Sequence, residues 1–111
     1  MRPPVLIVDD DPDIRESLTD MLGHEGYLVH SAASGTDALQ QAKQTRYDAA
    51  LLDIQLPDLN GLSVLKVLME LDASLPVIIL TGNVTPENTI GSLAKGAFAY
   101  LTKPYRAGHG V

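Results

Sequence analysis

Five short runs suited to β-strands are spaced along the chain, and a segment with helical spacing follows each of the first four. The runs are Val5–Val8, Tyr27–Ala32, Tyr47–Leu52, Pro76–Leu80 and Phe98–Leu101. Val5–Val8 and Pro76–Leu80 are continuous apolar runs, which are typical of strands that are covered on both faces. Strict alternation of such strands with helices predicts an α/β fold, in which helices pack on both faces of a parallel sheet.

The intervening segments carry the start signals of helices. Asp11 and Pro12 have the form of an N-cap followed by proline at the first helical position, and Ser34 opens a helix that extends to about Gln44. A third helix is expected after the breaker-rich loop that follows Asp53, and a fourth after Thr85-Pro86. The residues expected to face inward in the four helices are Ile14, Leu18, Met21 and Leu22, then Ala38, Leu39 and Ala42, then Leu62, Leu65, Leu68 and Met69, and finally Ile90, Leu93 and Ala94.

Length and charge exclude several classes of function. A chain of 111 residues corresponds to one domain. The formal net charge is −6 and the basic residues are not clustered, which argues against nucleic acid as a direct partner of this domain. The chain has no cysteine, so disulfides and thiolate metal sites are excluded. No apolar run is long enough for a signal peptide or a membrane span, and a cytoplasmic location without membrane contact is expected.

Reactive side chains follow the strands at the point where each strand ends. Asp9 and Asp10 follow the first strand, Asp53 the third and Thr81 the fourth, and Lys103 comes soon after the fifth. Ligands of open parallel sheets bind beyond the carboxyl ends of the strands. Three carboxylates there repel one another unless a hard cation such as Mg²⁺ lies among them. Together with a hydroxyl and an ammonium group, they predict a site for phosphoryl transfer to an aspartate.

Four motifs, in this order, resemble the receiver domain of two-component response regulators. They are VLIVDDD at Val5–Asp11, LLDIQLPDLNG at Leu51–Gly61, VIILTG at Val77–Gly82 and GAFAYLTKP at Gly96–Pro104. The resemblance implies a flavodoxin-like, three-layer α/β/α fold with a five-stranded parallel sheet of order 2-1-3-4-5. It also implies a signalling domain of a phosphorelay that takes part in its own phosphorylation and dephosphorylation, and not an enzyme for a separate substrate.

The same resemblance implies a role for each acidic residue. Asp53 would accept a phosphoryl group from the phosphohistidine of a histidine kinase. Mg²⁺ would be held by Asp9, Asp10, Asp53 and the main-chain carbonyl of Gln55. The side chain of Gln55 is a hypothesis of its own, because it could reach over the phosphoryl group and tune how fast water hydrolyses the aspartyl phosphate.

Further residues are implied in binding and switching. Thr81 would bond a phosphoryl oxygen, Tyr100 would swing inward when it does, and Lys103 would pair with the phosphoryl group. A cis peptide bond between Lys103 and Pro104 would aim the lysine. The expected partners are a sensor histidine kinase or phosphotransfer protein, an output domain or effector protein, and, as a further alternative, a second copy of the chain. The residues expected to contact the kinase, beside the acidic pocket, are Pro12 and Arg15.

Two other acidic-loop families compete for the same residues. An EF-hand would explain the alternating acids of residues 9–13, but Ile14 stands where that loop needs glycine and Pro12 stiffens its middle. A haloacid-dehalogenase phosphatase also has alternating aspartates after a strand. Asp13, however, stands where that family has a small hydroxyl residue or valine, and Asp53 would have no role.

A pseudo-receiver, which acts only as a protein-interaction module, is the alternative within the family. The residues that distinguish an active receiver are all present: Asp9, Asp10, Asp53, Thr81 and Lys103. The chain departs from the family pattern after Pro104, where only YRAGHGV follows and no apolar stripe marks a fifth helix. The expected domain is therefore a receiver over residues 1–111 that is truncated before its last helix. The apolar strand surface that this helix would cover is then bare, unless a partner covers it.

Overall fold

The structure is a computed structural model, and it describes residues 2–81 and 99–102 of the chain. Its elements are β1 (Pro4–Val8), α1 (Pro12–His24), β2 (Leu28–Ala32), α2 (Gly35–Gln44), β3 (Ala49–Asp53), α3 (Gly61–Leu71), β4 (Val77–Thr81) and β5 (Ala99–Thr102). The predicted alternation of strands and helices is confirmed up to β4. The predicted fourth helix and the question of a fifth helix lie outside the described residues.

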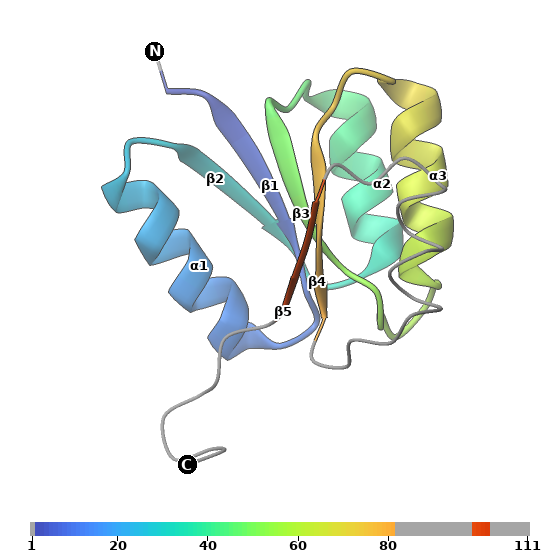
Figure 1. Cartoon of the computed structure of the whole chain (residues 1–111), viewed down its shortest axis with the longest axis horizontal. Helices are drawn as coiled ribbons and strands as arrows, with labels where there is room; N and C mark the ends of the chain where they lie inside the picture. The colour runs from blue at the N-terminus through green and yellow to red at the C-terminus, as the bar shows by residue number, and fades with distance from the viewer. Residues whose placement is uncertain (1, 82–98, 103–111) are drawn as a thin grey trace.

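The strands form one five-stranded parallel sheet with the order β2-β1-β3-β4-β5. Helix α1 lies on one face of this sheet, and α2 and α3 lie on the other (Figure 1). The three-layer flavodoxin-like architecture predicted from the sequence is therefore confirmed. Because every strand runs in the same direction, the carboxyl ends of β1, β3 and β4 meet at one edge.

Apolar side chains fill the space on both faces of the sheet, which is why the interior strands β1 and β4 contain runs of consecutive apolar residues. Alternate residues of β1 point to opposite faces, with Leu6 and Val8 in one cluster and Val5 and Ile7 in the other. Burial of one such side chain is worth about 1.5–3 kcal/mol. The buried residues on the side of α2 and α3 include Leu52, Val64, Leu65, Leu68 and Ile79, and those on the side of α1 are Val5, Ile7, Ile14, Leu18, Leu51 and Leu80.

Side-chain caps start the first two helices where the sequence predicts them. The Asp11 carboxylate accepts a hydrogen bond from the Asp13 N–H at 2.9 Å, and Pro12 occupies the first helical position. The Ser34 hydroxyl accepts from the Asp37 N–H at 3.1 Å. Such caps satisfy N–H groups that have no partner within the helix. They also start each helix within a few residues of a strand end, so that the positive ends of the helix dipoles lie at the acidic edge.

A glycine closes α1 at the opposite end. Gly26 follows the C-cap residue Glu25 and has φ of 94°, a backbone conformation that residues with a Cβ rarely adopt. Its N–H bonds the Gly23 carbonyl, and the N–H of Tyr27 bonds the Leu22 carbonyl, both at 3.1 Å. These two bonds form a Schellman motif, which turns the chain toward β2.

One predicted core residue is exposed. Met21 is placed inward by helical spacing, but 57 % of its surface is accessible, so this prediction is wrong. Helical periodicity places Met21 on the same stripe as Ile14 and Leu18, which are buried against the sheet. The periodicity cannot indicate how far along α1 the covering surface extends, and none of the described elements covers Met21. Met69 is partly buried against the core, as predicted.

Candidate functional site

The predicted acidic cluster forms where β1 and β3 end. Val8 is the register partner of Leu52, so the residues that follow these two positions emerge side by side. Carboxylate oxygens of Asp9, Asp10 and Asp53 lie within 4.8 Å of one another. Asp9 is fully buried, Asp53 is 2 % exposed and Asp10 is exposed. The fold therefore brings together three acids of which the outermost, Asp9 and Asp53, are 44 positions apart in the sequence, as the topology predicts.

The main chain around Asp9 is held by three hydrogen bonds. Its N–H donates to the Ala32 carbonyl at 3.1 Å, which extends the pairing of β1 with β2 by one residue. Its carboxylate Oδ1 accepts from the Asp11 N–H at 3.0 Å. The Arg15 guanidinium Nη1 donates to the Asp9 carbonyl at 2.7 Å. The positive charge of Arg15 therefore lies next to the main chain of Asp9. The sequence did not predict this contact.

Asp53 is held in a similar way by the residues that follow it. Its Oδ1 accepts a hydrogen bond from the Gln55 N–H at 3.1 Å. The loop that begins here closes on itself, because Gln55 forms a β-bridge with Asn60 and the Gly61 N–H donates to the Ile54 carbonyl at 2.7 Å. The closed loop holds the Gln55 N–H against the Asp53 carboxylate.

The tip of this loop is attached to the start of α2. Asp58 Oδ1 accepts from the Gly35 N–H at 2.8 Å, and Oδ2 accepts from the Thr36 N–H at 2.9 Å and from the Thr36 hydroxyl at 2.5 Å. Sequence reasoning missed this contact. The sequence shows an aspartate among loop-forming residues and, more than twenty positions earlier, the start of a helix. Nothing in the sequence indicates that these two features are in contact.

These hydrogen bonds predict an acid-sensitive contact. The Thr36 hydroxyl, followed by the N–H groups of Thr36 and Gly35, lowers the pKa of Asp58 to about 2. A carboxyl with a lowered pKa stabilises the folded state above the unfolded pKa of about 4, and this contribution is lost as the pH falls toward 2. We expect a ¹³C NMR titration of the Asp58 carboxyl in the folded chain to have its midpoint near pH 2, and Thr36→Val to raise it. A midpoint near pH 4 would contradict the contact.

The acidic donor set fits a hard divalent cation. Three carboxylates in one small volume repel one another, and two of them are buried, where water screens the repulsion poorly. Mg²⁺ binds through one or two carboxylates and keeps several of its waters, so a site with two buried acids and one exposed acid suits it. Among the described residues, this is the one group of three or more acidic or histidine side chains close enough to share an ion.

The remaining predicted site residues are placed to different extents. Thr81 is the last residue of β4, directly after Leu80, which is the register partner of Asp53, so its backbone reaches the same edge. Tyr100 lies in β5 beside Ile79. Pro12 is exposed at the start of α1. Lys103 and Pro104, with the predicted cis peptide bond, lie outside the described residues.

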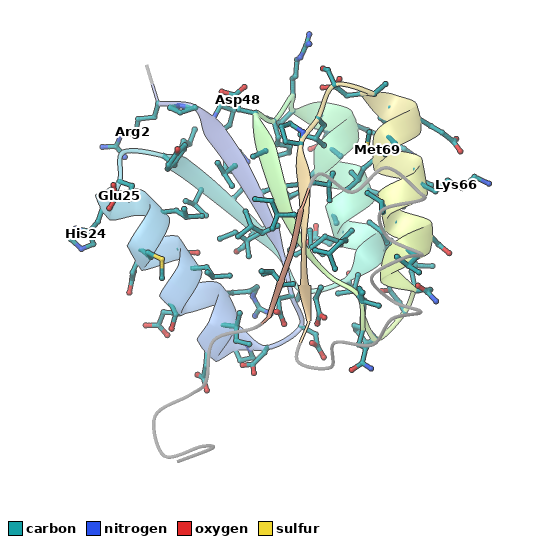
Figure 2. The ribbon with its side chains drawn as sticks, viewed as in Figure 1. Arg2, His24, Glu25, Asp48, Lys66 and Met69 are labelled. Carbon is teal, nitrogen blue, oxygen red and sulfur yellow. The ribbon has the colours of Figure 1, made fainter. Side chains whose placement is uncertain are left out.

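The ionisable side chains that are labelled in Figure 2 lie away from the edge of the sheet that carries the acidic cluster. Figure 2 shows Arg2, His24, Glu25 and Asp48 toward the end of the molecule where the strands begin, and Lys66 directed away from the sheet. The Nδ1 atom of His30 lies 2.7 Å from the Tyr47 hydroxyl oxygen, and His30 is not part of the acidic cluster. Within residues 2–81 and 99–102, none of the helices has the length and apolar character required to cross a bilayer.

Comparison with known proteins agrees with this geometry. Residues 5–110 match the family described as "Response regulator receiver domain". The chain is 41% identical over 103 residues to the transcriptional regulatory protein PrrA of Mycobacterium leprae, an alignment that covers 93% of this chain and 44% of that protein. The chain therefore spans less than half the length of this curated relative.

Solved structures show the same fold. A CheY-like response regulator receiver domain protein from Methanospirillum hungatei is 37% identical, with a TM-score of 0.91 over 96% of this chain and 85% of that one. A response regulator protein from Burkholderia pseudomallei, solved with a phosphorylated aspartic acid, calcium ion and citrate, is 26% identical. Its TM-score is 0.88, and the match covers 96% of this chain and 62% of that one.

Proposed function

Because this chain belongs to the response regulator receiver domain family, it is a receiver domain of two-component signalling, and we propose that Asp53 is its phosphoacceptor. The observation that carries the proposal is the position of the Asp53 carboxylate, at the end of a central strand and within 4.8 Å of two further carboxylates. A carboxylate that attacks a phosphoryl group needs a cation beside it, because the approaching group adds negative charge, and the two neighbouring carboxylates provide ligands for such a cation. The full acidic set also disfavours the pseudo-receiver.

The proposed metal ligands are the carboxylates of Asp9, Asp10 and Asp53 and the main-chain carbonyl of Gln55. When bound, Mg²⁺ supplies positive charge that offsets the negative charge on the oxygens of the phosphoryl group. The chain itself holds the nucleophile, because the Gln55 N–H at 3.1 Å orients the Asp53 carboxylate. A carboxylate oxygen of Asp53 attacks phosphorus, a new P–O bond forms, and the leaving group departs with the electron pair of the bond that breaks.

The phosphoryl group needs donors on its other side, and we propose the Thr81 hydroxyl and the Lys103 ammonium for this role. Thr81 is supported by the register of β4 against β3, which brings its backbone to the edge that holds Asp53. Tyr100 is proposed to move inward with Thr81. Lys103 and the cis bond before Pro104 rest on the family resemblance.

The proposed partners are a histidine kinase or phosphotransfer protein that supplies the phosphoryl group, and an output domain or effector that responds to it. Pro12 and Arg15 are the proposed kinase contacts. Pro12 is exposed beside the acidic edge, whereas Arg15 is half-buried and bonds the Asp9 carbonyl, so Arg15 would act in part through that loop. The relative PrrA is a transcriptional regulator, and we propose that any DNA contact in a longer protein lies outside this acidic domain, in a cytoplasmic setting.

A phosphorylation assay tests the function directly. We expect incubation with acetyl phosphate and Mg²⁺ to add one phosphoryl group to the chain, as read by intact mass, and peptide mapping to place it on Asp53. EDTA should reduce the adduct by at least about tenfold, because the acidic edge then lacks a neutralising cation. A folded sample that shows no adduct with Mg²⁺ would refute the proposed function and favour the pseudo-receiver.

A further inference from the structure

We propose that Asp58 is a positioning residue: by binding the start of α2, it holds the β3–α3 loop (residues 54–60) and thereby sets the affinity of the acidic site for Mg²⁺. We call the contact between Asp58 and the N–H groups of Gly35 and Thr36 the α2 clasp. The effect on Mg²⁺ rests on the proposed function, whereas the effect on the loop does not.

The clasp joins two segments that are distant in sequence. Gly35 and Thr36 lie 23 and 22 positions before Asp58, and both carboxylate oxygens are engaged. Two parallel N–H···O bonds to one carboxylate restrict its orientation as well as its distance. A third bond comes from the Thr36 hydroxyl. The tip of the loop therefore has a defined position relative to α2, although Asp58 is exposed.

Apolar packing reinforces the clasp at the same place. A Cβ atom added to Gly35 would lie 2.9 Å from Cβ and Cδ1 of Leu59 and 2.9 Å from Cγ2 of Val64. The bare backbone at Gly35 thus allows the loop and the first turn of α3 to approach α2 closely. Leu59, the residue after Asp58, packs against Gly35, and the N–H of the same glycine binds Asp58. The apolar contact and the hydrogen bond therefore support each other.

The base of the same loop carries the groups that matter for the metal site. The Gln55 N–H bonds the Asp53 carboxylate, and Gln55 bridges to Asn60, whose side chain caps α3 by accepting from the Leu62 N–H at 2.8 Å. Gln55 is three residues from Asp58. A loop fixed at its tip and at its base leaves little freedom for the peptide groups between them, and the Gln55 carbonyl is one of these groups.

The role of Asp58 is not accounted for by capping α2. That helix has its own cap, because the Ser34 hydroxyl already accepts from the Asp37 N–H. Thr36 is exposed, so that water could satisfy its N–H in the absence of Asp58, whereas Gly35 is buried where the loop packs against α2. The loop, in contrast, is joined to α2 by the hydrogen bonds of the Asp58 carboxylate, so loss of this carboxylate should loosen the loop more than the helix.

The test uses the 111-residue chain with three substitutions. Asp58→Ala removes the clasp. Thr36→Val removes only the hydroxyl bond and leaves the charge of Asp58 in place, which separates positioning from simple loss of negative charge. Asp72→Ala is the matched control, because Asp72 also accepts bonds from an N–H and a hydroxyl, those of Ser74, but caps the segment after α3 rather than the loop.

Two measurements apply to each variant: amide hydrogen exchange of the metal-free protein by NMR, and Mg²⁺ affinity by calorimetry. We expect Asp58→Ala to speed exchange of the Gln55 N–H about tenfold and to weaken Mg²⁺ binding about tenfold, the effect typical of residues that orient metal ligands. Thr36→Val should shift both in the same direction by a smaller factor. Asp72→Ala should change neither.

Unchanged Gln55 exchange in a folded Asp58→Ala variant would overturn the proposal, and so would faster exchange confined to the first turn of α2. Faster exchange of the Gln55 N–H without a change in Mg²⁺ affinity would overturn the part of the proposal that links Asp58 to Mg²⁺ binding. If the wild-type chain bound no Mg²⁺, the proposed function would fall, while the exchange rates of the metal-free protein would still decide whether Asp58 holds the loop.

Discussion

Replacing Asp53 with asparagine is expected to abolish phosphoryl uptake and leave the sheet intact. Asparagine has nearly the same shape, and its Oδ1 can still accept the Gln55 N–H that orients Asp53 at 3.1 Å. The amide carries no negative charge and is a far weaker nucleophile than a carboxylate. Loss of the nucleophile should lower the rate of adduct formation from acetyl phosphate by at least about a thousandfold, as measured by intact mass over time.

The same substitution should make the metal-free protein more stable. Asp53 is 2 % exposed and shares a small volume with Asp9 and Asp10, so that removal of one charge relieves repulsion that water screens poorly. We expect the free energy of unfolding in EDTA to rise by about 1 kcal/mol, as read from urea denaturation. Mg²⁺ should stabilise the wild type more than the variant, because the variant has lost a ligand.

Asp13→Asn is the control for both measurements. Asp13 belongs to the same acidic run, but it is exposed on the first turn of α1 and lies outside the cluster of three carboxylates. Its adduct formation should match that of the wild type. An adduct of wild-type amount on Asp53→Asn, or an adduct mapped to another residue of the wild type, would show that Asp53 is not the acceptor.

The acidic site was predictable from the sequence because the residues that follow the strands of a parallel sheet all lie at the same edge of that sheet. Asp9 and Asp53 each follow an apolar run, and two strands that run in the same direction and are paired must end together. The caps at Asp11 and Ser34 were predictable for a related reason, since each accepts a bond from an N–H two or three residues away. Local rules therefore indicated where the helices start and where the carboxylates gather.

Contacts between distant segments were not predictable in this way. The bonds from Asp58 to Gly35 and Thr36 depend on how the β3–α3 loop packs against α2, and no residue spacing encodes that distance. The exposure of Met21 depends on where the covering surface ends rather than on the period of α1. The bond from Arg15 to the Asp9 carbonyl depends on the direction in which α1 leaves the sheet.

Gly61→Ala is expected to be the most destabilising of the glycine-to-alanine substitutions in the described part of the chain. A Cβ at this position would lie 2.5 Å from the Asp53 carbonyl oxygen, 2.5 Å from the Ile54 Cα and 2.6 Å from the Ile54 carbonyl oxygen. All three atoms are backbone, so no side chain can rotate away to make room. The chain must instead shift where β3 enters the β3–α3 loop, at an expected cost of about 3 kcal/mol in the free energy of unfolding.

Gly23→Ala separates this steric effect from the general effect of replacing glycine. Gly23 lies inside α1, and a Cβ there would have nothing within 4 Å, so alanine should raise the free energy of unfolding by about 0.5–1 kcal/mol. Urea denaturation of the two variants should therefore give changes of opposite sign. A Gly61→Ala variant as stable as the wild type would mean that the β3–α3 loop can move away from Asp53 without cost. The hydrogen bond from Gly61 to Ile54 and the α2 clasp would then no longer be reasons to regard the β3–α3 loop as rigid.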